Sequence, residues 1–125
     1  EVLLLGGEDE YNKNKELGEK TGALIFKPRP IKDFIGIMNE CDVIVTVVSM
    51  AMHIAIGLKK KLILFNNIFN KNEFDLFDRG EIIEPERKCK CYFMATCKNE
   101  EYQCIEHISP HTIYRAIKRQ LDPAV

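Results

Sequence analysis

The chain has no long apolar run, no marked excess of charge of either sign, and no internal repeat or low-complexity tract over its 125 residues. A transmembrane helix needs ~20 consecutive apolar residues, so we expect no transmembrane segment. Eighteen basic residues against nineteen acidic ones leave a net charge of −1. That balance argues against a nucleic-acid partner, because such proteins usually carry a basic field. We expect one globular domain over residues 1–125 with a modest core.

The first residues, Glu1-Val2-Leu3-Leu4-Leu5, lie inside a strand-like run and include no initiator methionine. We interpret the chain as a fragment of a longer polypeptide. An edge strand lost by such a cut would leave backbone N–H and C=O groups unpaired. Dimerisation through an exposed sheet edge is therefore an expected risk for the fragment.

Short apolar runs alternate with helix-like segments along the chain. The predicted strands cover 2–6, 23–26, 42–47, 62–65 and 81–84. The predicted helices cover 8–21, the segment after Pro30, 49–56 and a last segment that reaches Leu121, with Ser109 as its N-cap and Pro110 in its first turn. Gly22 and Gly57 are expected to end the first and third. This alternation predicts an α/β fold, a Rossmann-like parallel sheet with flanking helices and right-handed crossovers.

The junction after the strand at 42–47 carries the first candidate site. Ser49 and His53 interrupt an otherwise apolar stretch there, and their spacing places them on one helix face. Ligands of open α/β sheets bind beyond the carboxyl ends of the strands, where a helix N-terminus offers N–H groups to an anion. The junction therefore predicts a phosphate-binding turn. The residues alone leave two plainer alternatives open: Ser49 as an N-cap, and His53 as a buried histidine bonded to a carbonyl.

Two other turns follow predicted strands. Gly6-Gly7 could let the backbone approach a nucleotide, although a tight strand-to-helix turn is the default interpretation. Asn66 and Asn67 follow the fourth predicted strand, where a loop could reach the same crevice. Solvated loop residues are an equally good interpretation of the two asparagines.

Four cysteines lie close together in a cysteine-rich segment at 86–107: Cys89, Cys91, Cys97 and Cys104. Four thiolates can meet one tetrahedral zinc ion, although a Cys-x-Cys start is less usual than Cys-x-x-Cys. We rank a structural zinc ion first, free thiols second, and two disulfides third, because disulfides require an oxidising compartment. The fifth cysteine, Cys41, is expected to be a small buried hydrophobe.

The features occur in an order that covers nearly all of the chain. They are Leu3-Leu4-Leu5-Gly6-Gly7-Glu8-Asp9-Glu10, then Cys41-Asp42-Val43-Ile44-Val45-Thr46, Ser49-x-x-x-His53-x-Ala55-x-Gly57, Lys61-Leu62-Ile63-Leu64-Phe65, and spaced cysteines before Ile108-Ser109-Pro110. This ordered set resembles the C-terminal domain of the family 9 glycosyltransferases, the heptosyltransferase family.

The resemblance implies the C-terminal half of a GT-B architecture, in which two Rossmann-like halves face each other across a cleft. It implies that this half binds the nucleoside-diphosphate sugar of an inverting enzyme. The full-length enzyme would transfer a heptose-like sugar to a glycan or lipopolysaccharide-type, lipid-linked acceptor. The implied donor-binding residues are Gly6, Gly7, Ser49, Met50, Ala51, His53, Asn66 and Asn67.

The general base and the acceptor contacts would lie on the N-terminal half, so the 125-residue chain is expected to have no transferase turnover by itself. No catalytic cofactor is implied. The implied location is the cytoplasm, with peripheral association at the inner face of the membrane as an option for the full-length protein.

One position departs from the family pattern, which commonly has Asp-Thr where this chain has Val48-Ser49. Ser49 keeps a hydroxyl group, whereas Val48 cannot replace a carboxylate. The departure motivates a degenerate transferase as one further hypothesis. The alternative from another functional class is a non-catalytic Rossmann-like module whose zinc-stapled cysteine segment mediates protein interaction.

Overall fold

The computed structural model describes residues 1–87, 89–91, 93–98 and 103–122. The chain divides into two compact units, Glu1–Glu40 and Cys41–Val125, and each is described by itself. Parts of the predicted cysteine-rich segment, residues 88, 92 and 99–102, lie outside the described residues. No helix within the described ranges combines the length and the apolar character needed to cross a membrane.

The first unit contains two short parallel strands and two helices, in the order β1 (Leu3–Leu4), α1 (Glu8–Thr21), β2 (Leu24–Ile25) and α2 (Ile31–Glu40). Helix α1 has the predicted limits, and it ends at Gly22, whose φ of 76° is the left-handed conformation that glycine adopts at low cost. Gly18 of α1 lies against β2, because a Cβ at this position would be 2.5 Å from Cγ1 of Ile25.

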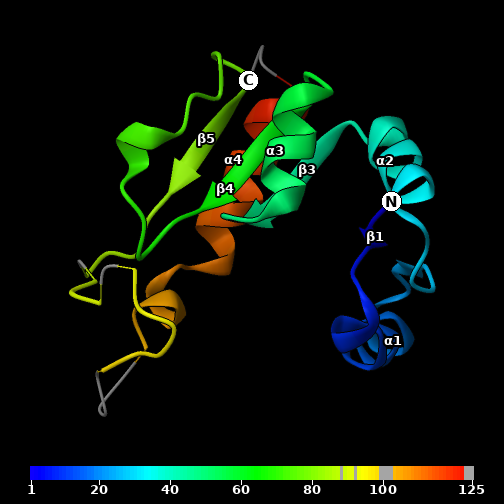
Figure 1. Cartoon of the computed structure of the whole chain (residues 1–125), viewed down its shortest axis with the longest axis horizontal. Coiled ribbons are helices and arrows are strands. Elements are labelled where there is room, and N and C mark those ends of the chain that lie inside the picture. Colours follow the sequence, from blue (N-terminus) through cyan, green and yellow to red (C-terminus); the bar gives the residue numbers. More distant parts are fainter. Residues whose placement is uncertain (88, 92, 99–102, 123–125) are drawn as a thin grey trace. The chain divides into compact units, whose positions relative to one another are not determined.

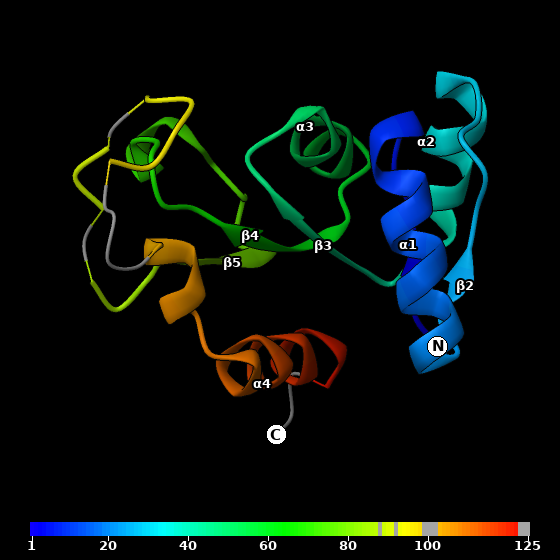
Figure 2. The ribbon, with the colours of Figure 1, turned by 90° about the horizontal axis from the view of Figure 1, so that it is seen from below.

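The second unit is a three-stranded parallel sheet with a helix on each face. Its elements are β3 (Val43–Val47), α3 (Met50–Gly57), β4 (Lys61–Phe65), η1 (Lys71–Glu73), β5 (Gly80–Ile83), η2 (Cys104–His107) and α4 (Pro110–Leu121). The strand order is β3-β4-β5. Helix α3 covers one face and α4 covers the other, as Figure 1 and Figure 2 show.

The core of this unit is built on β4, the central strand. Ile63 is fully buried and packs with Ile83 of β5 and Ala116 of α4. Leu62 and Leu64 are also buried, and they point to the opposite face because side chains alternate along a strand. Met52 of α3 is completely buried as well. Burial on both faces explains why β4 is a continuous apolar run in the sequence.

Polar contacts fasten α4 to the strands. The Lys61 ammonium donates to the Gln120 carbonyl oxygen at 2.5 Å. Both guanidinium contacts of Arg119 go to the Glu81 carboxylate, at 3.2 Å and 2.7 Å. The Arg119 hydrogen bonds hold the pKa of Glu81 below its usual range, against the opposing effect of burial. These contacts tie the C-terminal half of α4 to the starts of β4 and β5.

The structure confirms the α/β class, the parallel strands and the flanking helices, and it corrects three expectations. The hydrogen-bonded strands form two sheets, one in each unit, where the sequence predicts one. Helix α3 includes Gly57 as its last residue, one residue beyond the predicted end, and the left-handed residue that follows the helix is Lys59, with φ 58°. Cys41 is half-buried where a buried residue was expected.

Hydrogen bonds explain where α3 ends. The Lys59 amide donates to the Ile56 carbonyl at 3.0 Å, and the Lys60 amide donates to the Ala55 carbonyl at 3.0 Å. This pair of bonds is the Schellman arrangement, in which the residue after the C-cap adopts the left-handed conformation. That residue is a lysine here, so the glycine signal two residues earlier was misleading.

Candidate functional site

The N-terminus of α3 lies directly beyond the carboxyl end of β3. Ser49 occupies the N-cap position with an extended backbone, φ −164° and ψ 178°. The first turn of α3 contains no acidic residue. The positive end of the helix dipole and the amides of this turn are therefore not neutralised by a carboxylate of the turn itself.

Ser49 does not cap this helix through its side chain, which corrects the N-cap expectation. Its hydroxyl donates instead to the Val47 carbonyl oxygen at 3.1 Å and lies 3.3 Å from the Thr46 hydroxyl oxygen. Among the described contacts, the Ser49 hydroxyl makes no capping hydrogen bond to α3. The hydroxyl therefore points back along β3.

The residues after Ser49 divide into a solvent side and a core side. Met50 is 61% exposed and Ala51 is half-buried. His53 is exposed, so the alternative of a buried, carbonyl-bonded histidine is wrong. The His53 amide lies 3.5 Å from the Ser49 carbonyl oxygen, which makes it a long first bond of the helix. The solvent side thus carries an accessible imidazole next to the helix N-terminus.

The two glycines of the candidate site belong to the first unit, whereas the other candidates belong to the second. The Gly7 amide donates to the Glu10 carboxylate at 2.9 Å, and the first turn of α1 also contains Glu8 and Asp9. A Cβ on Gly6 would lie 2.8 Å from the Glu10 Cβ, so the tight turn itself requires glycine. The α1 N-terminus is already occupied by a carboxylate.

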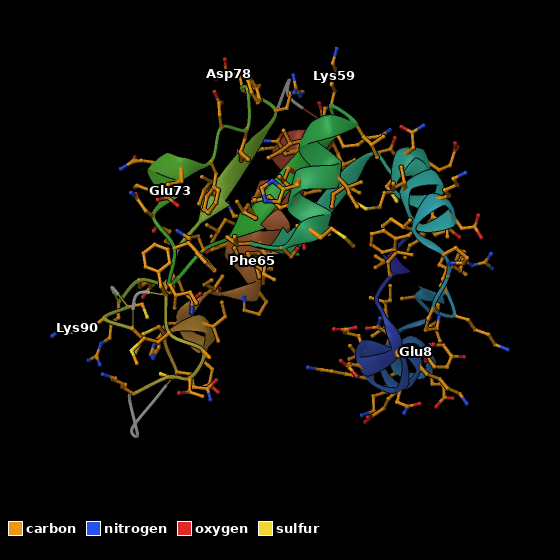
Figure 3. All side chains as sticks on the ribbon, viewed as in Figure 1. Glu8, Lys59, Phe65, Glu73, Asp78 and Lys90 are labelled. Atoms are coloured by element: carbon orange, nitrogen blue, oxygen red, sulfur yellow. The ribbon has the colours of Figure 1, made fainter. Side chains whose placement is uncertain are left out.

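Asn66 and Asn67, after β4, differ in their surroundings. Asn66 is 1% exposed; its amide nitrogen donates to the Phe69 carbonyl at 2.8 Å, and its oxygen accepts from the Phe69 amide at 3.1 Å. The Asn66 side chain is therefore buried and holds the turn through its two hydrogen bonds to the Phe69 backbone. The interpretation of Asn66 as a solvated loop residue is wrong. Figure 3 places Phe65 at the end of β4, and Glu73 on η1, further along the same connection.

The four clustered cysteines line one cavity of about 150 Å³ together with residues of the loop after β4. Cys89, Cys91 and Cys104 are buried around Ile68, and Cys97 is exposed. Sequence reasoning did not link the loop after β4 to the cysteines; the apolar pair Ile68-Phe69 between asparagines was the available signal.

Backbone amides reach two of the sulphur atoms. The Cys91 amide donates to Cys89 Sγ and the Lys98 amide donates to Cys91 Sγ, both at 3.3 Å. Hydrogen bonding from the Lys98 amide is the main cause that lowers the pKa of the Cys91 thiol. Burial is the main cause that raises the pKa of Cys89.

The structure contains no disulfide among the five cysteines, all of which are described. Within the described residues, no group of three or more histidine, cysteine, aspartate or glutamate side chains is already arranged to hold a metal ion. A second cavity, of about 400 Å³, lies between residues 67–72 on one side and residues 84–86 with Cys89 on the other, and Asn67 and Cys89 line both cavities.

Comparison with protein-family models, with curated proteins and with solved structures found no match to this chain.

Proposed function

We propose that this chain is the donor-binding half of a glycosyltransferase and that the diphosphate of a nucleoside-diphosphate sugar binds at the N-terminus of α3. The observation that carries the proposal is the uncapped start of α3 at the carboxyl end of β3, with exposed His53 in its first turn. The resemblance of the ordered motifs to the C-terminal domain of the family 9 glycosyltransferases supports the same assignment.

In this proposal, the site at the N-terminus of α3 stabilises the leaving group of the reaction. Negative charge builds on the diphosphate as the bond to the sugar breaks. The amides of Met50 and Ala51 and the positive dipole end of α3 would stabilise that charge, and His53 would donate a hydrogen bond beside it. The general base and the acceptor site belong to the other half in this proposal, so the isolated chain is expected to bind donor without turnover.

The test is an NMR titration of the 125-residue chain with ADP, UDP and GDP, following the backbone amides from Ser49 to His53. We expect at least one nucleotide to shift these amides. We expect His53→Ala to weaken the response while the remaining spectrum stays that of a folded protein.

His111→Ala is the matched control. His111 is also an exposed histidine in the first turn of a helix, but its amide already donates to the Ser109 hydroxyl oxygen at 3.2 Å. Nucleotide shifts should survive this substitution. If no nucleotide shifts the α3 amides, or if both variants weaken binding equally, the donor-site proposal is wrong.

The second candidate function is a non-catalytic module whose cysteine segment binds zinc and contacts another protein. The common cavity of the four cysteines favours its metal-binding part. The two candidates make different predictions, because this module should be indifferent to nucleotides and to His53→Ala.

A further inference from the structure

The cysteine cavity has the composition of a soft-metal site. Sulphur side chains approach it from both sides of the segment between β5 and α4, with Cys89 and Cys91 before the residues 99–102 and Cys104 after them. The Cys104 thiol contributes to the raised pKa of Cys89, and the Cys97 thiol contributes to the lowered pKa of Cys91. Cysteines that are separated along the segment therefore act on one another around the same cavity.

Burial separates the four sulphur atoms into a core of three and a fourth at the rim. Cys89, Cys91 and Cys104 are 6%, 6% and 4% exposed, whereas Cys97 is exposed. Cysteines that are buried only because they pack in a core need not line one cavity. These four cysteines do line a single cavity. Because Cys97 lies at the rim, its side chain can close over the cavity without displacing the packed three.

The surroundings would support negatively charged sulphur. The amides of Cys91 and Lys98 already point at sulphur atoms, and groups of this kind orient and stabilise the ligands of a metal. Lys90 and Lys98 are exposed on the same segment, and Figure 3 shows the Lys90 side chain at its outer edge. Of the two, Lys98 acts electrostatically on Cys91 and would partly offset the double negative charge of a tetrathiolate complex.

We propose that Cys89, Cys91, Cys97 and Cys104 bind one Zn²⁺ ion as a tetrahedral tetrathiolate site. Four thiols lose four protons to solvent and form four Zn–S bonds, with no change of oxidation state. Thiolate ligands select soft ions, and zinc needs neither an oxidant nor a preassembled cluster. Because no three of the described ligands are yet in place, binding draws the sulphur atoms toward one another.

The site has a structural consequence near the sheet. Asn67 and Ile68 form the wall of the cavity that belongs to the loop after β4. A zinc ion held by the four cysteines would therefore lie against that loop, beyond the carboxyl ends of β4 and β5, where Figure 1 shows the loop and the cysteine segment lying together. This inference does not rest on the proposed donor site.

The experiment uses the 125-residue chain, reduced and stripped of metal, and titrates it with Co²⁺ as a spectroscopic probe. We expect sulphur-to-cobalt charge-transfer and tetrahedral d–d absorption that saturates at one equivalent, and displacement of this absorption by one equivalent of Zn²⁺. Zinc should also raise the midpoint of thermal unfolding.

Cys97→Ser is the informative variant, because an exposed side chain can be replaced without disturbing the core. It should weaken zinc affinity by more than the ~10–100-fold cost of losing an outer-shell partner. Cys41→Ser is the matched control, since Cys41 lies outside the cavity, and it should leave affinity unchanged.

Three outcomes would overturn the proposal. The first is a titration without tetrahedral thiolate absorption. The second is equal loss of affinity in Cys41→Ser and Cys97→Ser. The third is a mass of the unreduced chain that shows disulfides within the cluster, because those sulphurs could not then serve as thiolate ligands.

Discussion

Replacing Gly57 with alanine should stabilise the second unit. This is unexpected from the sequence, because a glycine that directly follows an apolar helical segment usually marks the end of the helix. Gly57 is the last residue of α3 and does not have a positive φ, and a Cβ at this position would meet no described atom within 4 Å. Glycine inside a helix is roughly 0.5–1 kcal/mol less favourable than alanine. We therefore expect Gly57→Ala to raise the free energy of unfolding by about 0.5–1 kcal/mol.

The complementary substitution is at Lys59, which holds the left-handed conformation that closes α3. This conformation costs a residue with a Cβ about 1–2 kcal/mol, whereas glycine adopts it freely but loses more chain entropy on folding. Losing the lysine charge at a helix C-terminus costs roughly 0.3 kcal/mol or more. The balance leaves Lys59→Gly stabilising by about 0.5 kcal/mol.

Urea unfolding followed by circular dichroism measures both changes. Lys59→Ala is the control, because it removes the same charge but keeps a Cβ in the left-handed conformation, and it should not stabilise. If the sequence-based placement of the helix end were right, the signs would reverse: Gly57→Ala would lose about 1 kcal/mol or more and Lys59→Gly would gain nothing. That pattern would refute the Schellman assignment.

Two further predictions concern β5. Gly80→Ala should destabilise the second unit by roughly 1–3 kcal/mol or more. The added Cβ would overlap the Leu62 carbonyl oxygen and lie 2.9 Å from the Leu62 carbonyl carbon. Urea unfolding measures this loss, and Gly36→Ala is the control because a Cβ at Gly36 has open space. Glu81→Gln should lower stability at neutral pH. Arg119 lowers the pKa of Glu81, so the contribution is complete above the ordinary carboxyl value of about 4.5 and disappears as pH falls through the lowered folded value. Stability measured from pH 7 to pH 2 should therefore show the variant and the parent chain converging in acid.

Local sequence signals were sufficient for several elements. The limits of α1 follow from its acidic first turn and from Gly22, which supplies the left-handed residue. Helix α4 begins as predicted, because Ser109 caps it and Pro110 fits its first turn. Each of these signals is complete within a few residues, so no distant contact can change it.

Other features depend on partners that sequence patterns do not reveal. The burial of Asn66 results from two hydrogen bonds to the Phe69 backbone, which require a particular path of the loop. Ser49 matches an N-cap in sequence, yet its hydroxyl bonds to the Val47 carbonyl and thus competes with capping. Four cysteines predict a cluster, but Ile68 joins it from a different loop.

The three α-helices with a described N-cap, α1, α3 and α4, differ in the groups that surround their N-termini. At α1 the Glu10 carboxylate accepts from the Gly7 amide, and at α4 the Ser109 hydroxyl accepts from the His111 amide. At α3 the Ser49 hydroxyl makes no such bond. An anion gains most at an N-terminus that has neither a capping side chain nor acidic residues in its first turn, and of these three α-helices only α3 meets both conditions.

This argument sets capping and ligand binding in competition at Ser49. Ser49→Asp would place a carboxylate on the amides at the start of α3, which should raise the free energy of unfolding by about 0.5–1 kcal/mol. The same carboxylate would repel a diphosphate, so the nucleotide-induced shifts of the α3 amides should disappear from a protein that is more stable than its parent. Ser49→Ala, which adds no charge, should retain them. A stabilised Ser49→Asp variant that still binds nucleotide would place the diphosphate away from α3, because a site built on these amides cannot serve two anions.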